Sequence, residues 1–273
     1  MIDCHVHTER CRHAGGCAVD YVRAAAARGI ETLTFTEHLP LAPAIAERVE
    51  GAEGYAMPAH ELADYHAEVA RAAVLGRELG VEVLLGCEAD LVPLGVDHAR
   101  ELIAAYPYDL VLGSVHFVGD WAFDDPDRTD GYADWDIREL WERYFADLAE
   151  AARTGLADAI AHPDLVKKFC FRPEGDLTGL YRDLAGALAS AGVAVEVNSA
   201  GLRKPCAELY PGPELLRELS AAGVPATVGS DAHAPEEVGA GLTQAVIALK
   251  EAGYRSVVVF RGRQPVEVGI DEL

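Results

Sequence analysis

The chain has few basic residues and lacks the signals that direct proteins to membranes. Lysine and arginine together number 23 against 45 aspartates and glutamates in 273 residues, which gives a formal net charge of −22. Such a surface repels nucleic acid and anionic membranes, so we expect neither as a partner. No apolar run is long enough to cross a bilayer, and the N-terminus shows no basic stretch followed by an apolar one. We therefore expect a cytoplasmic protein.

Two cofactor signatures and a disulfide framework are also missing. The first predicted strand is not followed by Gly-x-Gly-x-x-Gly, and no phosphate-binding loop motif occurs, which argues against a nucleotide cofactor. The six cysteines are scattered and fit reduced thiols better than a disulfide scaffold. A zinc knuckle built from Cys4, Cys11, His13 and Cys17 is disfavoured, because the spacing matches no standard pair-of-pairs pattern.

What the chain does contain is a regular alternation of strand-like and helix-like segments. Apolar, β-branched runs alternate with amphipathic segments at least seven times. Expected strands cover 1–6, 31–36, 81–87, 110–115, 157–161, 193–197, 226–230 and 256–260, and expected helices cover 20–28, 58–79, 96–105, 137–154, 177–191, 213–222 and 242–252. Residues 39–57 and 117–135 are expected to be loops. No linker divides the chain, so we expect a single α/β domain over 1–273, and seven or eight units favour a closed parallel barrel.

Side chains that can bind metals recur at the C-terminal ends of the predicted strands. In a barrel of alternating strands and helices, these ends form the rim that carries the active site. The set contains seven of the ten histidines and two carboxylates, with Glu37 beside His38. Its members are His5, His7, His13, His38, Glu88, His116, His162, Asp231 and His233. His5 and His7 are two residues apart on a strand and therefore point to the same face.

The chemistry of this set favours a metal cluster. Imidazoles and carboxylates are ligands for divalent metals, and no thiolate is required. The set exceeds what one ion can use, so it predicts two or three ions with at least one bridging carboxylate. The alternative is a hydrogen-bonded polar plug that closes the barrel mouth. It is disfavoured because it would bury many imidazoles with few partners, at a large desolvation cost.

Basic residues lie beside the predicted ligands. They are Arg10, Arg12, Lys167, Lys168, Arg203 and Lys204. Each alone is explained by solvation at the surface. As a group they fit contacts to phosphate, and Arg203 is favoured because a guanidinium can grip a phosphate with two hydrogen bonds.

Seven ordered motifs resemble those of the PHP (polymerase and histidinol phosphatase) family. They are Asp3-x-His5-x-His7-Thr8 with Cys11-x-His13, Thr36-Glu37-His38, Gly86-x-Glu88, Gly113-Ser114-Val115-His116, His162-x-Asp164, Asn198 with Ala200-Gly201-Leu202-Arg203, and Gly229-Ser230-Asp231-Ala232-His233. The resemblance covers nearly the whole chain. Within the family it is closest to the monofunctional histidinol-phosphate phosphatases, chiefly through Cys11-x-His13 and residues 198–203.

The resemblance implies a distorted TIM-like (β/α)7 barrel with three divalent metal ions, which are zinc, iron or manganese in similar enzymes. Glu88 would bridge the first two ions. The first would be held by His5, His7, Glu88 and Asp231, the second by Glu88, His116 and His162, and the third by His13, His38 and His233. Glu37 stands where many relatives have aspartate, which affects only the surroundings of the ligand His38.

The implied function is hydrolysis of a phosphate monoester, L-histidinol phosphate, to L-histidinol in histidine biosynthesis. Arg203 would stabilise charge on the phosphoryl oxygens. The candidates to protonate the leaving alkoxide are Asp231, His233 and a metal-bound water. The expected substrate contacts are Arg203, Lys168, Asp164 and Arg10. Asp164 and the carboxylates of residues 121–127 would face the amine and imidazole of the substrate.

Three other functions remain open at this stage. A related phosphoesterase could act on a nucleotide, and a catalytically silent domain could bind metal only. A metal-dependent amidohydrolase would more typically show a lysine or carboxylated bridge at a strand end. The favoured partner is a small phosphorylated substrate, and a homodimer is one candidate for the assembly.

Overall fold

The computed structural model describes residues 1–92 and 94–273, and within them seven parallel strands form one sheet. The strands are β1 (Ile2–Val6), β2 (Thr32–Phe35), β3 (Glu82–Asp90), β4 (Leu110–Ser114), β7 (Ala159–Ile160), β8 (Ala194–Asn198) and β9 (Ala226–Gly229). Each strand pairs in parallel with the next one along the chain. This order, without a crossover, is that of a barrel rather than of an open doubly wound sheet.

The sheet closes where the last barrel strand meets the first. Val6 forms a parallel bridge with Ala232, and the amide of His7 donates to the carbonyl of Ala232 at 2.9 Å. The amide of Asp231 donates to the carbonyl of His5 at 2.7 Å. The result is a near-closed barrel of seven parallel strands, which confirms the predicted fold class.

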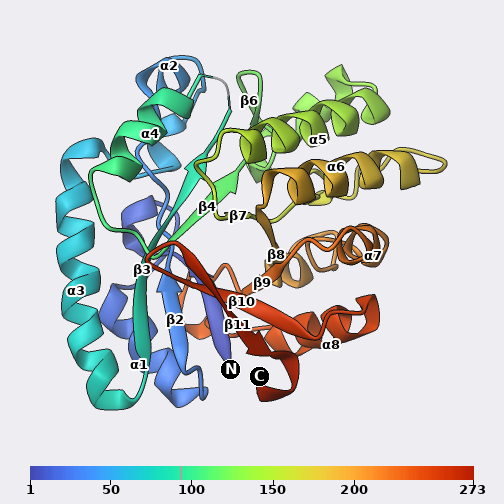
Figure 1. Cartoon of the computed structure of the whole chain (residues 1–273). Helices are drawn as coiled ribbons and strands as arrows, with labels where there is room; N and C mark the ends of the chain where they lie inside the picture. The colour runs from blue at the N-terminus through green and yellow to red at the C-terminus, as the bar shows by residue number, and fades with distance from the viewer. Residues whose placement is uncertain (93) are drawn as a thin grey trace.

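Helices surround the barrel, as Figure 1 shows. They are α1 (Ala18–Ala27), α2 (Pro43–Ala46), α3 (Leu62–Leu79), α4 (Val96–Ala104), α5 (Ile137–Arg153), α6 (Thr178–Ala191), α7 (Pro213–Ala221) and α8 (Leu242–Ala252). Every residue of β1, β2, β4, β8 and β9 is buried, because helices cover the outside of the sheet and side chains fill its inside. This double burial explains the continuous apolar runs in the sequence.

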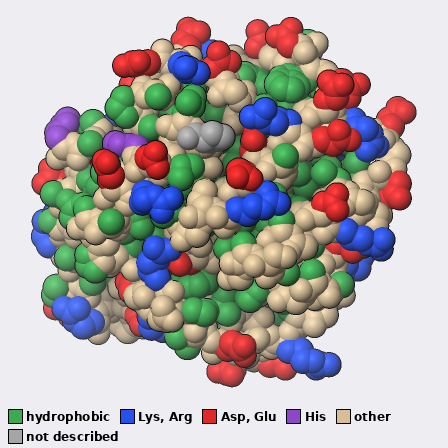
Figure 2. Space-filling view, turned by 45° about the horizontal axis from the view of Figure 1, so that its top comes forward, with side chains coloured by type: hydrophobic (Ala, Val, Ile, Leu, Met, Phe, Trp, Pro, Cys, Tyr) green, Lys and Arg blue, Asp and Glu red, His purple; other side chains and the backbone are tan. Residues whose placement is uncertain are grey.

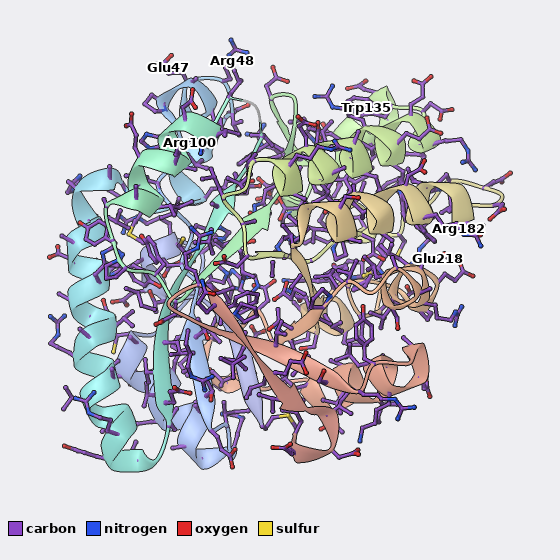
Figure 3. The ribbon with its side chains drawn as sticks, in the orientation of Figure 1. Glu47, Arg48, Arg100, Trp135, Arg182 and Glu218 are labelled. Atoms are coloured by element: carbon purple, nitrogen blue, oxygen red, sulfur yellow. The ribbon has the colours of Figure 1, made fainter. Side chains whose placement is uncertain are left out.

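Helix α5 illustrates how local sequence produces these outer elements. It begins after Asp136, whose carboxylate accepts hydrogen bonds from the amides of Arg138 and Glu139. Its buried side chains, which include Leu140, Tyr144 and Leu148, recur every four residues and form one apolar face. The outer faces are polar. In Figure 3, Arg182 of α6 and Glu218 of α7 point toward one another, with 3.0 Å between Nε and Oε2.

The surface carries the acidic excess without gathering it into one patch on the face seen in Figure 2, where acidic and basic side chains are interspersed. No helix of residues 1–92 and 94–273 combines the length and apolar character needed to cross a membrane. All six cysteines are free, as the sequence predicts.

Three regions differ from the sequence prediction. The strand expected at 256–260 exists as β10 (Ser256–Arg261), but it leaves the barrel and pairs antiparallel with β11 (Gln264–Gly269), which the sequence did not predict. Strand β11 is largely exposed and lacks the apolar run of a buried strand. The expected loops at 39–57 and 117–135 contain α2 and a small hairpin of β5 (Phe117–Val118) and β6 (Trp121–Ala122).

Candidate metal centre

The nine predicted metal ligands all lie at the C-terminal rim of the barrel. They come from or directly follow β1, β2, β3, β4, β7 and β9, apart from His13, which follows a short 3₁₀ turn at Glu9–Cys11. Parallel strands of a barrel end at one rim, so side chains distant in sequence meet there. We call His5, His7, His13, His38, Glu88, His116, His162, Asp231 and His233 the histidine–carboxylate cluster.

Glu88 stands at the centre of this cluster, and its two oxygens face different imidazoles. Oε2 lies 3.4 Å from Nε2 of both His5 and His7, and 3.2 Å from Nδ1 of His38. Oε1 lies 3.5 Å from Nε2 of His116 and 2.8 Å from Nε2 of His162. One carboxylate thus adjoins two separate groups of nitrogen atoms, which is the arrangement of a bridging ligand.

Two further groups of donor atoms converge beside Glu88. Oδ1 of Asp231 lies 3.6 Å from Nε2 of His5 and 3.4 Å from Nε2 of His7, and these three donors are within 4.8 Å of one another. The donors of His13, His38 and His233 also lie within 4.8 Å of one another. The imidazole rings of His13 and His233 are stacked with centroids 4.9 Å apart.

Hydrogen bonds on Nδ1 fix the orientation of several imidazoles. Nδ1 of His5 lies 2.7 Å from Oε1 of Glu196, and Nδ1 of His116 lies 3.1 Å from both carboxylate oxygens of Asp90. The same role falls to Glu37 for His7, to the carbonyl of Gly54 for His13 and to the carbonyl of Asp231 for His233. A partner on Nδ1 leaves Nε2 as the atom available for a metal.

Two candidate ligands sit on strained backbone. His162 has φ 47° and Asp231 has φ 50°, which place both in the left-handed region that non-glycine residues rarely adopt. Such conformations cost about 1–3 kcal/mol and tend to persist at functional sites. In both cases the side chain contacts the cluster, so the strain serves the position of a donor atom.

The electrostatics of the cluster show how its charges depend on one another. Burial raises the pKa of Glu88, but the imidazoles of His38 and His116 more than offset this and hold that pKa well below its usual range. Burial lowers the pKa of His5, but the carboxylates of Glu196 and Asp231 raise it by more, so this pKa lies well above its usual value. Burial likewise opposes the hydrogen bonds to Asp231 and Glu37 that raise the pKa of His7 to about 9.

The residues fit a group of divalent cations. Oε1 of Glu88 is buried and has no partner with hydrogen-bond geometry among the described residues, although Nε2 of His162 is only 2.8 Å away. A buried carboxylate without a satisfied partner is costly. The surrounding donor atoms are closely spaced, with only 2.9 Å between the Nε2 atoms of His5 and His7. Imidazole with carboxylate is a donor set for zinc, iron or manganese.

A cavity of about 390 Å³ opens beside the cluster. Its charged and aromatic walls are formed outside the cluster by Lys168 and Lys204, by Asp124 and Asp125, and by Tyr55 and Tyr210. Nζ of Lys168 lies 2.6 Å from the carbonyl oxygen of Asp124 and 3.2 Å from its Oδ2. The cavity therefore offers both signs of charge next to the donor cluster.

Of the four predicted substrate contacts, Lys168 lines this cavity. Arg203 does not line it, but it contacts the carbonyl of the lining residue Asp231. Arg203 lies behind Asp231: its Nη2 donates to the carbonyl of Ser230 at 2.8 Å, and its Nε is 3.3 Å from Oε1 of Glu237. Nη1 of Arg203 is buried without a hydrogen-bond partner in the described part of the chain. Arg203 thus supports the Asp231 backbone and keeps one donor free.

The other two predicted substrate contacts are not in the cavity. Nε of Arg10 lies 2.6 Å from Oε2 of Glu68, so the guanidinium is turned toward α3. Oδ2 of Asp164 lies 2.7 Å from Nζ of the buried Lys167 and accepts the amide of Gly212. Both side chains already have a partner of opposite charge, and neither lines the cavity in this structure.

Several residues at the site were not identified from the sequence. Glu196 and Asp90 hold imidazoles, and both stand inside strands that read as apolar runs. A signal existed for each, because Glu196 lies two residues before Asn198 and Asp90 lies two residues after Glu88, so each shares the inward face of a neighbouring polar residue. Tyr55 and Tyr210 come from loops, and nothing in the sequence indicated them.

Comparison with known proteins agrees with the resemblance found in the sequence. Residues 3–200 match the model of the PHP domain, and residues 216–251 match that of the PHP-associated region. The chain is 37% identical to a probable histidinol-phosphatase of Deinococcus radiodurans, over 97% of this chain and 98% of the relative. It is 27% identical to the histidinol-phosphatase of Bacillus subtilis, over 87% of this chain and 95% of that protein.

Solved structures share the fold over nearly the whole chain. The histidinol phosphate phosphatase of Lactococcus lactis, crystallised with zinc, L-histidinol and phosphate, superimposes with a TM-score of 0.81 at 22% identity, over 97% of this chain and 98% of that one. A putative histidinol phosphatase of Listeria monocytogenes gives 0.80 at 20% identity, over 89% and 99%. With the family model matching most of its length, this chain belongs to the PHP domain family.

Proposed function

We propose that the chain is a metal-dependent phosphoric monoester hydrolase that converts L-histidinol phosphate to L-histidinol and phosphate in histidine biosynthesis. One observation carries the chemistry: the buried carboxylate of Glu88 lies within 3.5 Å of five imidazoles at the edge of a cavity of about 390 Å³. The choice of substrate is supported by the relative from Deinococcus radiodurans.

In this proposal three divalent ions occupy the histidine–carboxylate cluster, and zinc, iron or manganese would suit the donors. His5, His7 and Asp231 share the first ion with Glu88, because their donor atoms converge within 4.8 Å. His116 and His162 adjoin the other oxygen of Glu88 and hold the second ion with it. The third lies among His13, His38 and His233.

When bound, such ions supply an activated water and neutralise charge on the phosphoryl oxygens. The side chains do the remaining work. Lys168 faces the cavity and attracts the phosphate. Arg203 does not line the cavity, so its buried and unpaired Nη1 would have to turn toward it to reach a phosphoryl oxygen. The water oxygen bonds to phosphorus as the bond from phosphorus to the substrate oxygen breaks. The proton that the attacking water loses passes to the departing alkoxide, and Asp231 and His233, which line the cavity, or a second water would carry it.

The acidic side chains of the cavity suit the rest of the substrate. Asp124 and Asp125 line the cavity together with Tyr55, whose hydroxyl donates to Asp124 at 3.3 Å. The ammonium and imidazole groups of histidinol phosphate are attracted by carboxylates. Asp124 is one of the carboxylates of residues 121–127 that the sequence proposed for this role together with Asp164, and its contact with Lys168 presents both charges to one substrate.

The proposal extends to domain organisation, location and assembly. Residues 1–273 act as one domain, since closing the barrel requires both the first and the last barrel strand. The enzyme works in the cytoplasm on a small phosphorylated substrate. A homodimer is the assembly to look for, and size-exclusion chromatography with light scattering measures it.

Steady-state kinetics on a panel of substrates tests this function. We expect the metal-loaded protein to release phosphate from histidinol phosphate with a kcat/KM at least 100-fold above that for nucleoside monophosphates. His116→Ala should abolish turnover and Arg203→Ala should reduce it. His60→Ala is the matched control, because that imidazole is largely exposed and outside the cluster. Bound metal without turnover of any phosphoester would overturn the proposal, and equal activity on nucleotides would assign a different substrate.

A further inference from the structure

The loop between β1 and α1 carries the most exposed member of the cluster. His13 is exposed, whereas the other candidate ligands are buried or half-buried. Among the described residues its imidazole makes one hydrogen bond, from Nδ1 to the carbonyl of Gly54 at 2.9 Å, and it stacks on the ring of His233. Arg12, directly before it, has φ 78°. A left-handed conformation is unfavourable for arginine and needs support from the surroundings.

Two arginines in this loop are held by α3 and the turn before it. Nε of Arg10 lies 2.6 Å from Oε2 of Glu68, and Nη2 of Arg12 lies 2.6 Å from Oε1 of Glu61. Nη1 of Arg10 also approaches Glu61 at 3.7 Å. Glu61 and Glu68 are seven residues apart, which is about two helical turns, so they face the loop from the same side.

The carboxylate of Glu68 contacts the chain at two places, at Arg10 within the loop and at Ala18, where α1 begins. While Oε2 pairs with Arg10, Oε1 accepts the amide of Ala18 at the start of α1 at 3.0 Å. The side chains of Arg10 and Glu68 are only 20% and 12% exposed. Partial burial reduces screening by solvent, so this pair is worth more than an exposed surface ion pair.

The loop is also tied to another member of the cluster. The amide of Gly15 donates to the carbonyl of His233 at 2.8 Å, and the amide of Glu9 donates to the carbonyl of Gly16 at 3.0 Å. Movement of the loop would therefore change the distance between His13 and His233. Their stacked rings hold the donor atoms that converge with His38.

We propose that Arg10 and Arg12, clamped by Glu68 and Glu61, are positioning residues that set the affinity of the His13–His38–His233 group for its metal ion. This inference rests on the proposed function, because it takes that group as one of three metal sites. It assigns Arg10 a role distinct from substrate binding. Outer partners of metal ligands typically contribute 10- to 100-fold to metal affinity, so we expect an effect of about that size.

Metal counting separates this inference from the proposed function. Arg10→Met and Glu68→Gln proteins are loaded with zinc and dialysed against a graded series of chelator, and bound zinc is counted by mass spectrometry. We expect the wild-type protein to retain three ions, and both variants to retain two while binding the third about 10- to 100-fold more weakly. His13→Ala should lose the same ion, which identifies the site.

Control variants make the result specific. Arg143→Met removes a comparable ion pair with Asp147 on α5 and should retain three ions. If Arg10→Met does not fold, Glu61→Gln removes the partner of Arg12 from a less buried position and should also weaken the third ion. Unchanged affinity in all folded clamp variants would overturn the inference. A wild-type protein that binds no zinc would overturn the proposed function itself.

Discussion

Nε2 of His162 lies 2.8 Å from Oε1 of Glu88, yet the two atoms do not have hydrogen-bond geometry. Both residues belong to the histidine–carboxylate cluster. We expect Glu88→Gln to lose metal and to lower kcat/KM for histidinol phosphate by at least about 100-fold, because a neutral amide cannot bridge two cations. Metal analysis and phosphate release check this together. Glu78→Gln, at an exposed position of α3, should behave as wild type.

Protonation of the imidazoles should make the stability of the metal-free protein fall with rising pH, whereas the affinity for metal should rise. In the metal-free protein, burial opposes but does not cancel the carboxylate contacts that raise the pKa of His7 to about 9 and that of His116 to about 10. The stability contributed by their protonated forms is complete below the unfolded value of about 6.5 and is lost as the pH rises toward 9–10.

Metal binding must displace these protons, so affinity rises over the same interval. Thermal unfolding between pH 6.5 and 9 should therefore show a falling midpoint for the metal-free protein and a growing upward shift on addition of zinc. A metal-free midpoint that stays constant or rises in this range would contradict the assigned interactions.

Much of the site was predictable because parallel strands end at one rim. The pattern of His5-x-His7, Glu88, His116, His162 and Asp231 after apolar runs follows from that rule alone, and the structure brings these side chains together. That they hold ions stays a prediction. The sequence could not reveal which partner neutralises each charged side chain, because such partners depend on tertiary contacts.

Arg10 shows this limit most clearly. Its position between two predicted ligands suggested phosphate, but its partner Glu68 lies 58 residues away on α3. Asp164 is similar, since its Oδ2 accepts the amide of Gly212, 48 residues away, and contacts Lys167. The C-terminal hairpin was missed for another reason: β11 is exposed, so no buried apolar run marks it.

Gly229 is required by the close approach of β9 to the inward-facing side chains of neighbouring strands. A Cβ at this position would overlap Cβ of His5 and Oε1 of Glu196. We expect Gly229→Ala to destabilise the protein by about 1–3 kcal/mol and to weaken metal binding, because His5 must shift. Urea unfolding measures the first effect and zinc titration the second. Gly179→Ala is the control, since a Cβ there meets open space, and equal stability of the two variants would refute this expectation.

The buried pair of Lys167 and Asp164 should be important for stability rather than for chemistry. Nζ of Lys167 contacts Oδ2 of Asp164 at 2.7 Å and the carbonyl of Leu209 at 2.7 Å, and the lysine side chain is fully enclosed. Lys167→Met leaves a buried carboxylate unpaired and should cost about 3–5 kcal/mol. The double variant with Asp164→Asn should recover part of that loss in urea unfolding. Additive effects in this cycle would argue against direct coupling of the two side chains.

Asp124 should determine which phosphate esters the enzyme prefers. It lines the cavity beside Lys168, and burial raises its pKa less than Lys168 and His116 lower it, so it is ionised at neutral pH. Asp124→Asn removes the charge that attracts the substrate ammonium but leaves the histidine–carboxylate cluster intact. We expect kcat/KM for histidinol phosphate to fall about 10- to 100-fold, since one charge-assisted hydrogen bond is lost. For a phosphate ester without an amine, such as glycerol phosphate, kcat/KM should stay constant or rise, because Lys168 becomes free to bind phosphate.

Asp127→Asn is the control for this prediction. Asp127 lies in the same loop but outside the cavity lining, so this variant should change neither kcat/KM value. A parallel loss on both substrates would mean that Asp124 supports the site generally and does not read the amine.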